Sequence, residues 1–135
     1  MTVFIDTSAL YAVLDADDEH HQAAKHTWVE LIEQKTDLTI TNYIVVETSV
    51  LVQRRLGIAA LRTLQADIIP ILRVEWVTEI DHQSGVSALL VAANRQLSLV
   101  DCVSFEKMRS LGLKTAFAFD RHFSEQGFEC VPTEY

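Results

Sequence analysis

The amino-acid sequence predicts an α/β protein with a mostly parallel central sheet and helices on both of its faces. Along the 135-residue chain, short apolar segments typical of strands alternate with longer segments whose apolar residues recur at helical spacing. This alternation is typical of βαβ units. In such sheets ligands bind in the crevice beyond the carboxyl ends of the strands. Two aspartates, Asp6 and Asp120, are predicted to follow strands directly.

Length and composition indicate one domain, residues 1–135, with a hydrophobic core. Hydrophobic residues make up 49% of the chain, and no apolar run approaches the roughly 20 residues of a membrane span. The N-terminus has no basic region before its apolar residues, so we do not expect a signal peptide. The two cysteines, Cys102 and Cys130, are too few for a disulfide framework or a four-ligand zinc site. We therefore expect a cytoplasmic protein that does not enter the membrane.

The charge balance is acidic, with 11 Lys and Arg residues against 19 Asp and Glu residues and a formal net charge of −8. Taken alone, this charge opposes binding to nucleic acid and favours an acidic domain without such a partner. The alternative is that several carboxylates converge on a bound divalent cation. The cation would then neutralise much of the excess charge locally.

The first strand is predicted at Thr2–Ile5, a β-branched and aromatic run that ends at Asp6. Thr7 and Ser8 then open a helix with apolar residues at helical spacing. The next segment carries four acids, Asp15, Asp17, Asp18 and Glu19. We expect these acids at the N-terminus of a second helix, where the helix dipole favours negative charge. That helix is predicted to run to about residue 35, with Ala24, Trp28, Leu31 and Ile32 on its buried face.

A strand is predicted at residues 38–41, and residues 42–56 are ambiguous because many of them favour strands. The length of the segment, a cap at Asn42 and a stop at Gly57 favour a largely buried helix. On that helix Glu47 lies on an aliphatic face, where a carboxylate is costly unless it is paired or bound to metal. The residues leave two alternatives open, which are an ion pair with Arg54 or Arg55 and a metal site.

The middle of the chain is predicted to form a helix at residues 57–69, which Pro70 ends, and a strand at residues 71–77. Thr78 and Asp81 have the spacing of a capping box that begins another helix. The apolar stripe of that helix is predicted to be core, and it consists of Val86, Leu89, Leu90, Ala93 and Leu97.

The C-terminal third places two more acids at the ends of elements. Asp101 lies at the start of an amphipathic helix that Gly112 ends, and a strand at 115–119 leads to Asp120. A last strand is predicted at residues 128–131. Taken singly, such an aspartate is usually a helix cap. Together with Glu47, the acids match the need of a two-metal site for several carboxylates around ions about 3.5–4 Å apart.

Four segments resemble the PIN domain family, and most of all its VapC-type toxins from bacterial type II toxin–antitoxin pairs. They are IDTSAL at 5–10, VET at 46–48, SLVDCVSF at 98–105 and AFAFDRHF at 116–123, in the family's order and spacing. The resemblance implies a three-layer α/β/α fold around the mostly parallel sheet. It also implies an endoribonuclease, a hydrolase that depends on Mg²⁺ or Mn²⁺.

The resemblance implies that the catalytic and metal-binding acids are Asp6, Glu47, Asp101 and Asp120. It assigns supporting hydroxyl groups to Thr7 or Ser8, beside the first acid, and to Ser104, beside the third. In the mechanism that this implies, bound metal activates a water for phosphodiester hydrolysis and Glu47 completes the cluster or orients that water. Arg121 is expected to meet a phosphate. Some relatives carry a further acid two residues beyond the fourth, where this chain has His122.

The partners implied by the resemblance are an RNA substrate, an antitoxin protein and a second copy of the chain in a homodimer. An acidic protein suits a basic partner segment. The aliphatic surface of residues 42–69 is our candidate for contact with the antitoxin. The alternative function is that of a non-catalytic PIN-like module that binds RNA or a protein. Metal-dependent cleavage discriminates between the two.

Overall fold

A computed structural model describes residues 1–135 and contains one sheet of five strands, all of them parallel to their neighbours. The strands are ordered β3-β2-β1-β4-β5 across the sheet. Their bounds are Thr2–Ile5 for β1, Asp37–Thr41 for β2, Arg73–Glu75 for β3, Thr115–Phe117 for β4 and Glu129–Val131 for β5. The predicted α/β class is confirmed, and β3, β4 and β5 are shorter than predicted.

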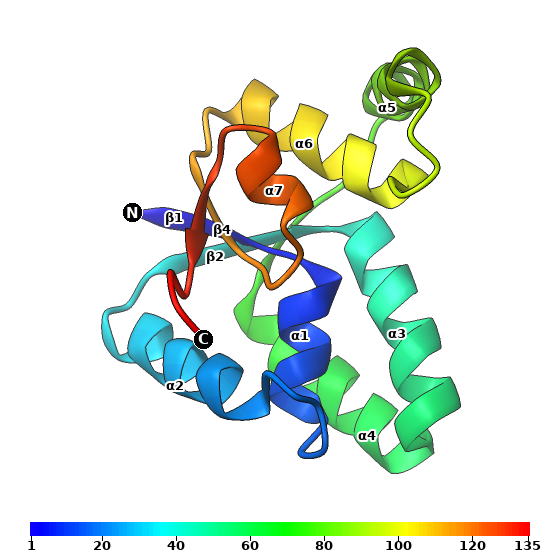
Figure 1. The fold of residues 1–135 in the computed structure, drawn as a ribbon. Helices are drawn as coiled ribbons and strands as arrows, with labels where there is room; N and C mark the ends of the chain where they lie inside the picture. The colour runs from blue at the N-terminus through cyan, green and yellow to red at the C-terminus, as the bar shows by residue number, and fades with distance from the viewer.

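Helices cover both faces of the sheet, so the chain forms three layers (Figure 1). One face carries α6 (Leu99–Leu111) and the short α7 (His122–Glu125), which the sequence did not predict. The opposite face carries α1 (Thr7–Leu14) and α2 (His21–Glu33). The remaining helices are α3 (Asn42–Leu56), α4 (Ile58–Thr63) and α5 (Glu79–Ala92), and wider and tighter helical turns connect α4 to β3 through residues 64–71. None of these helices is long and apolar enough to cross a membrane.

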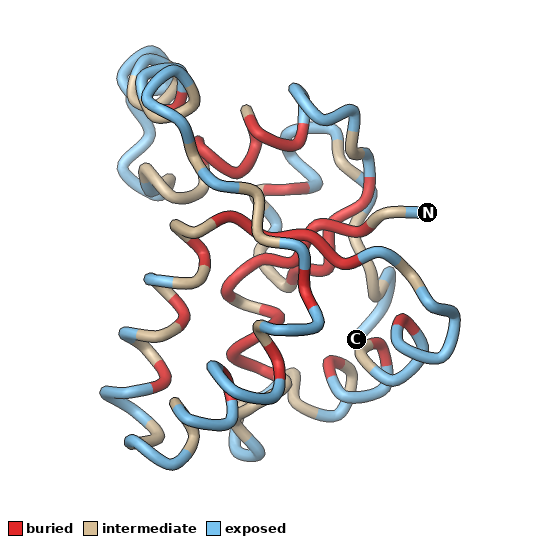
Figure 2. The backbone as a smooth tube through the Cα atoms, turned by 180° about the vertical axis from the view of Figure 1, so that it is seen from behind, coloured by how far each residue is buried: buried red, intermediate tan, exposed pale blue.

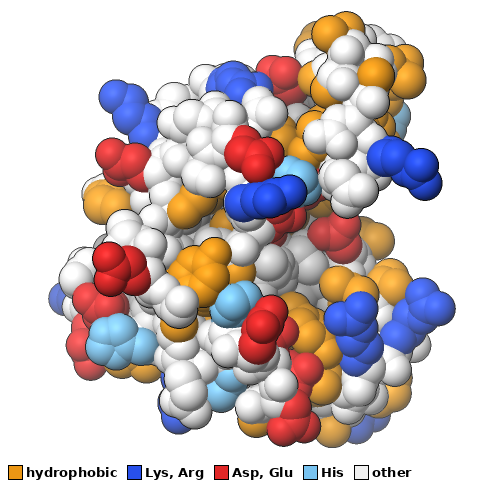
Figure 3. Space-filling view, viewed as in Figure 1, with side chains coloured by type: hydrophobic (Ala, Val, Ile, Leu, Met, Phe, Trp, Pro, Cys, Tyr) orange, Lys and Arg blue, Asp and Glu red, His pale blue; other side chains and the backbone are white.

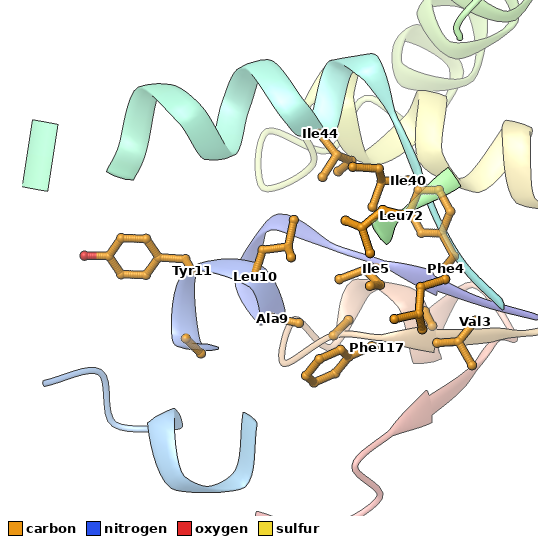
Figure 4. Close-up of a cluster of buried hydrophobic side chains, with 14 of the residues drawn as sticks. Val3, Phe4, Ile5, Ala9, Leu10, Tyr11, Ile40, Ile44, Leu72 and Phe117 are labelled. Atoms are coloured by element: carbon orange, nitrogen blue, oxygen red, sulfur yellow. The ribbon is translucent and has the colours of Figure 1, made fainter. Parts of the chain in front are cut away.

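The core lies around β1, the central strand, whose Val3, Phe4 and Ile5 have no exposed surface. Side chains from β1, α1, β2, α3 and β4 meet there (Figure 4). On the other face of the sheet, Phe123 of α7 packs edge-on against Phe105 of α6, with ring centroids 5.0 Å apart. A central parallel strand that is buried on both faces needs such a continuous apolar run. The packing therefore fixes the carboxyl end of β1 relative to α6 and α7.

The sequence predicts the acidic segment 15–19 at the start of α2, but this segment lies in the turn that follows α1. Helix α2 has no acid in its first turn and no side-chain cap. The two carboxylate oxygens of Asp15 accept hydrogen bonds from the Tyr11 hydroxyl at 2.8 Å and from the Asp17 amide at 2.9 Å. Aspartates that bond to nearby backbone in this way stabilise turns in competition with helix. Ile32, predicted to be buried, is exposed.

Helix α3 is confirmed as a helix, but two details of its prediction are wrong. Its cap is Thr41, whose hydroxyl accepts a hydrogen bond from the Ile44 amide at 3.2 Å. Asn42 instead uses its side-chain oxygen to accept from the Val77 amide at 2.7 Å. The helix is also not largely buried, since only Ile44, Thr48 and Val52 are buried along it. A spacing of four residues puts these three on one face, and the opposite face reaches solvent.

Helix α5 packs on α6 and not on the sheet, so its predicted core stripe is wrong. Only Gly85 of this helix is buried, and a Cβ atom at that position would lie 2.4 Å from Cγ2 of Val103. The predicted capping box of Thr78 and Asp81 is present. Three apolar side chains on the helix are largely exposed: Ile80 at 75%, Leu90 at 73% and Val91 at 87%. Figures 1 and 2 show α5 standing off beyond α6, with mostly exposed residues.

Candidate active site

The four acids singled out in the sequence lie together at the carboxyl edge of the sheet. Asp6 follows β1, and Asp120 follows the neighbouring strand β4. Asp101 is the third residue of α6, and Glu47 lies in the second turn of α3. The charges of Asp101 and Asp120 raise the pKa of Asp6 and of Glu47, and the charge of Asp120 raises the pKa of Asp101, which places the four acids within electrostatic reach. Figure 3 shows acidic side chains in the hollow between α6 and α3.

Asp6 is the most buried of the four, with 4% of its surface exposed. It caps α1, and its Oδ2 atom accepts hydrogen bonds from the Ser8 amide at 3.2 Å and the Ser8 hydroxyl at 2.6 Å. Burial above all, together with the charges of Asp101 and Asp120, raises the pKa of Asp6 to about 7, although the hydrogen bonds from Ser8 lower it. The sequence therefore places a carboxylate where its charge is costly unless a cation joins it.

Ser8 also connects Asp6 to the segment that carries Asp120. The Ser8 hydroxyl accepts a hydrogen bond from the Phe119 amide at 3.1 Å, while it donates to Asp6. The Asp6 amide donates to the carbonyl oxygen of Phe117 at 3.0 Å. Between them these bonds hold the start of α1 against the chain that leaves β4. Ser8 is therefore the hydroxyl residue that supports the first acid in this structure.

Thr7 supports Glu47 rather than Asp6. Burial raises the pKa of the half-buried Glu47, as do the charges of Asp101 and Asp120, and the Thr7 hydroxyl opposes them. The hydroxyl of fully buried Thr48 donates to Thr7 Oγ1 at 3.3 Å, which leaves the Thr7 hydrogen free to point to Glu47. The alternative of an arginine partner is not seen. Glu47 forms no ion pair, and the Arg55 guanidinium lies over the Tyr11 ring, 5.3 Å from its centroid.

Asp101 is at once a helix cap and a member of the acidic cluster. Its Oδ2 atom accepts a hydrogen bond from the Ser98 amide at 3.0 Å, and its own amide donates to the Ser98 hydroxyl at 3.0 Å. Burial above all, and then the charge of Asp120, raise the pKa of Asp101, which the Ser98 amide lowers. Ser104, expected to support this acid, donates its hydroxyl to the carbonyl oxygen of Val100 at 2.8 Å.

Asp120 is accompanied by a histidine whose role the sequence left unassigned. The Asp120 Oδ1 atom accepts a hydrogen bond from the His122 amide at 2.9 Å. The imidazole of His122 lies 3.7 Å from the same oxygen and 3.5 Å from Glu125, and its Nδ1 atom is buried without a hydrogen-bond partner. In the sequence, only the position of His122 two residues beyond Asp120 indicated that this histidine could belong to the site. Arg121 is exposed and forms an ion pair with Glu125 at 3.2 Å.

The donor set suits a hard divalent cation, although no three acidic, histidine or cysteine side chains already form a metal-binding group. Each of the three aspartates uses one oxygen to accept a backbone amide, from Ser8, Ser98 or His122. The second oxygen of each takes part in no such bond. Carboxylate oxygens of this kind are the ligands that Mg²⁺ and Mn²⁺ prefer. The arrangement can therefore accept a hydrated cation beside an open hollow.

The whole chain is similar to proteins of known fold and activity. The PIN domain family model matches residues 3–129. The chain is 35% identical over 134 residues to the 23S rRNA-specific endonuclease VapC20 of two Mycobacterium tuberculosis strains, covering 98% of this chain and 99% of that protein. The crystal structure of VapC20, described as a sarcin–ricin loop cleaving toxin, superposes with a TM-score of 0.82 at 34% identity. That match covers 93% of this chain and 95% of the other.

A more distant structure shares the fold alone. FitAcB of Neisseria gonorrhoeae gives a TM-score of 0.70 at 16% identity and covers 96% of both chains. Together with the VapC20 structure, it confirms the three-layer α/β/α fold that the sequence resemblance implied.

Replacement of Asp6 by asparagine is expected to stabilise the metal-free protein at alkaline pH. The folded protein holds the pKa of Asp6 at about 7, against an ordinary value of 3.8. Between about pH 4 and pH 7, Asp6 is deprotonated in the unfolded chain but still protonated in the folded protein. The free energy of unfolding is therefore highest below about pH 4 and falls as the pH rises toward 7. The effect is at most about 4 kcal/mol. Urea unfolding with EDTA at pH 5 and pH 8 measures it.

The control is Asp37→Asn, because Asp37 is exposed at the opposite end of the sheet. Asparagine at position 6 retains an oxygen to accept from Ser8, so the cap survives. If the Asp6 variant and the unaltered protein lose stability in parallel between pH 5 and pH 8, the charge on Asp6 does not destabilise the folded protein.

Proposed function

This chain belongs to the PIN domain family, and we propose that it is a metal-dependent endoribonuclease, the toxin of a type II toxin–antitoxin pair. The observation that carries the proposal is the meeting of Asp6, Glu47, Asp101 and Asp120 at the carboxyl edge of the sheet. The identity of 35% to VapC20 along nearly the whole chain supports the same reaction. Its place of action would be the cytoplasm, where RNA is found.

The proposed substrate is ribosomal RNA. VapC20 is named as an endonuclease specific for 23S rRNA and as a toxin that cleaves the sarcin–ricin loop. The similarity between the two chains extends over both ends of the fold and is not confined to the acidic segments. A hairpin with the sequence of that loop is therefore the first substrate to test.

The metal we propose is Mg²⁺ or Mn²⁺, held by the free oxygens of Asp6, Asp101 and Asp120, with Glu47 close to them. When bound, such an ion lowers the pKa of a coordinated water and stabilises negative charge on the phosphate. The chain supplies the frame, because Ser8, Ser98 and the His122 amide fix one oxygen of each aspartate. The Thr7 hydroxyl lies beside Glu47 and lowers the pKa of that carboxyl.

Glu47 is the residue we propose to orient the attacking water and to accept its proton. Burial and the neighbouring charges raise the pKa of Glu47, which makes its carboxylate a better proton acceptor at neutral pH. The Thr7 hydroxyl keeps that carboxylate from turning away. We propose that Arg121 leaves its exposed pair with Glu125 to meet a phosphate oxygen, since arginine binds phosphate through paired N–H donors.

Replacement of Asp101 by asparagine is expected to reduce Mg²⁺-dependent cleavage of the hairpin by on the order of a hundredfold or more. The stability of the fold should change little, because the amide oxygen of asparagine can still accept from Ser98. Single-turnover cleavage and urea unfolding measure the two effects separately.

Asp81→Asn is the matched control, because Asp81 has the same capping-box position in α5 but lies outside the cluster. Asp81 forms an ion pair with Lys107 at 2.7 Å, so this change should cost about 1.5–3 kcal/mol of stability and leave cleavage intact. Normal cleavage and metal affinity in Asp101→Asn would mean that Asp101 is only a cap. If the unaltered protein shows no metal-dependent cleavage, the non-catalytic RNA- or protein-binding module becomes the better account.

We also propose that the chain forms a homodimer through α5. Ile80, Leu90 and Val91 expose a large apolar surface on α5, a helix whose main packing partner is α6. Apolar side chains gathered on one exposed element commonly mark a protein interface. A second copy of the same helix offers the complementary surface in a two-fold arrangement.

Leu90→Glu is expected to weaken dimerisation by roughly thirtyfold or more, since it places a charge in the buried centre of the interface. Light scattering after size exclusion gives the mass, and circular dichroism checks the fold. The control is Val29→Glu, which adds the same charge at an exposed position on α2. A monomeric unaltered protein, or a Leu90→Glu variant that remains dimeric, would rule this surface out.

The antitoxin surface we propose is the exposed aliphatic side of α3 and α4 within residues 42–69. Val46, Val50 and Ile58 are exposed on these two helices. A partner with a basic and apolar segment would complement this side of an acidic chain. A product of the neighbouring reading frame with a DNA-binding N-terminus is the candidate partner.

Ile58→Lys is expected to weaken binding of that co-expressed product at least tenfold, because the change removes an apolar contact and places a positive charge against a basic partner segment. Isothermal titration with the purified partner measures the affinity, and Val29→Lys is the control for added charge. Equal affinities of the Ile58 variant and the unaltered chain would place the antitoxin elsewhere.

A further inference from the structure

A pocket of about 360 Å³ opens beside the acidic cluster, between the start of α3 and the start of α6. It is lined by Asn42, Tyr43, Val46, Glu47 and Val100. Glu47 belongs both to this pocket and to the acidic cluster, and Val100 directly precedes Asp101. The pocket is therefore continuous with the site at which the proposed reaction takes place. In Figure 3 hydrophobic side chains lie next to acidic ones along this part of α3.

The walls of the pocket combine an aromatic ring, aliphatic groups and one free hydrogen-bond donor. The Tyr43 hydroxyl is hydrogen bonded to Nδ1 of His82 on α5, and the two rings meet edge-on, so the tyrosine ring is held in place. Val46 is 62% exposed, so its aliphatic side chain is open to a ligand. The Asn42 oxygen accepts from the Val77 amide at 2.7 Å. The Asn42 amide nitrogen forms no hydrogen bond within the chain, so its N–H donors are free.

We propose that this pocket binds an unpaired base of the RNA, next to the phosphate that is cleaved. The inference rests on the proposed ribonuclease function. Proteins recognise RNA sequence chiefly through unpaired bases that stack on aromatic side chains and form hydrogen bonds along their edges. Tyr43 offers the ring, Val46 and Val100 enclose the base, and Asn42 donates to an acceptor on its edge.

The position of the pocket favours a base over an apolar side chain of a protein partner. A phosphate held at the carboxylates brings its two flanking nucleotides against the adjoining walls, and this pocket is the apolar wall beside Glu47 and Asp101. An apolar side chain of a protein would fill the aliphatic part of the pocket, but it has no acceptor for the free amide group of Asn42. Residues of α3 and of the start of α6 would therefore determine which base the protein prefers beside the cleaved phosphate.

Steady-state cleavage by two variants at Tyr43 tests the proposal. Loss of an aromatic side chain that stacks on a base weakens binding by roughly five- to a hundredfold. Tyr43→Ala should therefore raise KM at least fivefold on an RNA hairpin with all its bases, while kcat changes less. On a hairpin with an abasic site at the base that the pocket holds, Tyr43→Ala and the unaltered protein should cleave alike. Tyr43→Phe keeps the ring but loses the hydrogen bond to His82, so it should raise KM less than Tyr43→Ala does.

A matched pair on α3 keeps the test decisive if Tyr43→Ala folds poorly. Val46→Ala and Val50→Ala make the same change at two exposed positions, one inside the pocket and one a helical turn outside it. Only Val46→Ala should raise KM, and only for the hairpin with the base. Equal effects of the two valine changes, or equal effects on intact and abasic RNA, would overturn the proposal.

A binding measurement separates failure of the pocket from failure of the proposed nuclease. An RNA with 2-aminopurine beside the cleavage position is titrated with the Asp101→Asn protein, which should leave the RNA intact. Fluorescence quenching that disappears with Tyr43→Ala supports the pocket even if the unaltered protein cleaves nothing. Absence of quenching would contradict base binding in the pocket. Loss of partner-protein affinity in Tyr43→Ala, with unchanged RNA binding, would show that a protein side chain occupies the pocket instead.

Discussion

The burial of Asp6 at the carboxyl end of the central strand is the constraint around which this end of the molecule is built. A carboxylate with 4% of its surface exposed and other acids nearby is unfavourable when it is charged. Ser8 offsets part of that cost with two hydrogen bonds, and the same hydroxyl accepts from Phe119 and so holds the chain that leads to Asp120. The remaining cost is the driving force for cation binding at this edge of the sheet.

The same backbone devices that begin helices also position the acids. Asp6 is the cap of α1, and Asp101 completes the capping box of α6. Each cap fixes one carboxylate oxygen on a rigid helix start and leaves the other oxygen for a ligand. Asp81 shows that the device by itself does not make a site. In α5 the same capping box directs its carboxylate to Lys107, and Asp81 contributes to none of the pKa shifts of the acidic cluster.

Two outer helices give the molecule apolar surface that its own core does not use. Helix α3 buries one face through Ile44, Thr48 and Val52 and exposes aliphatic residues on the other. Helix α5 contacts α6 at Gly85 and exposes most of its apolar residues. The hydrogen bond between Tyr43 and His82 connects these two helices above the acidic hollow. An interface on either helix would therefore lie close to the site where we propose that RNA binds.

The sequence by itself determined the features that depend on neighbours along the chain. Local propensity and short-range hydrogen bonds account for the strand at Thr2–Ile5, the capping box at Thr78 and the helix end at Gly112. They also account for the positions of Asp6 and Asp101 at helix starts. Only the tertiary structure decided which surfaces these elements meet. It left Ile80, Leu90 and Val91 of α5 exposed, brought the Thr7 hydroxyl to Glu47 and placed His122 beside Asp120. The physical reason is that an apolar or acidic side chain carries the same local signal whether its partner is the core, a distant residue or another molecule.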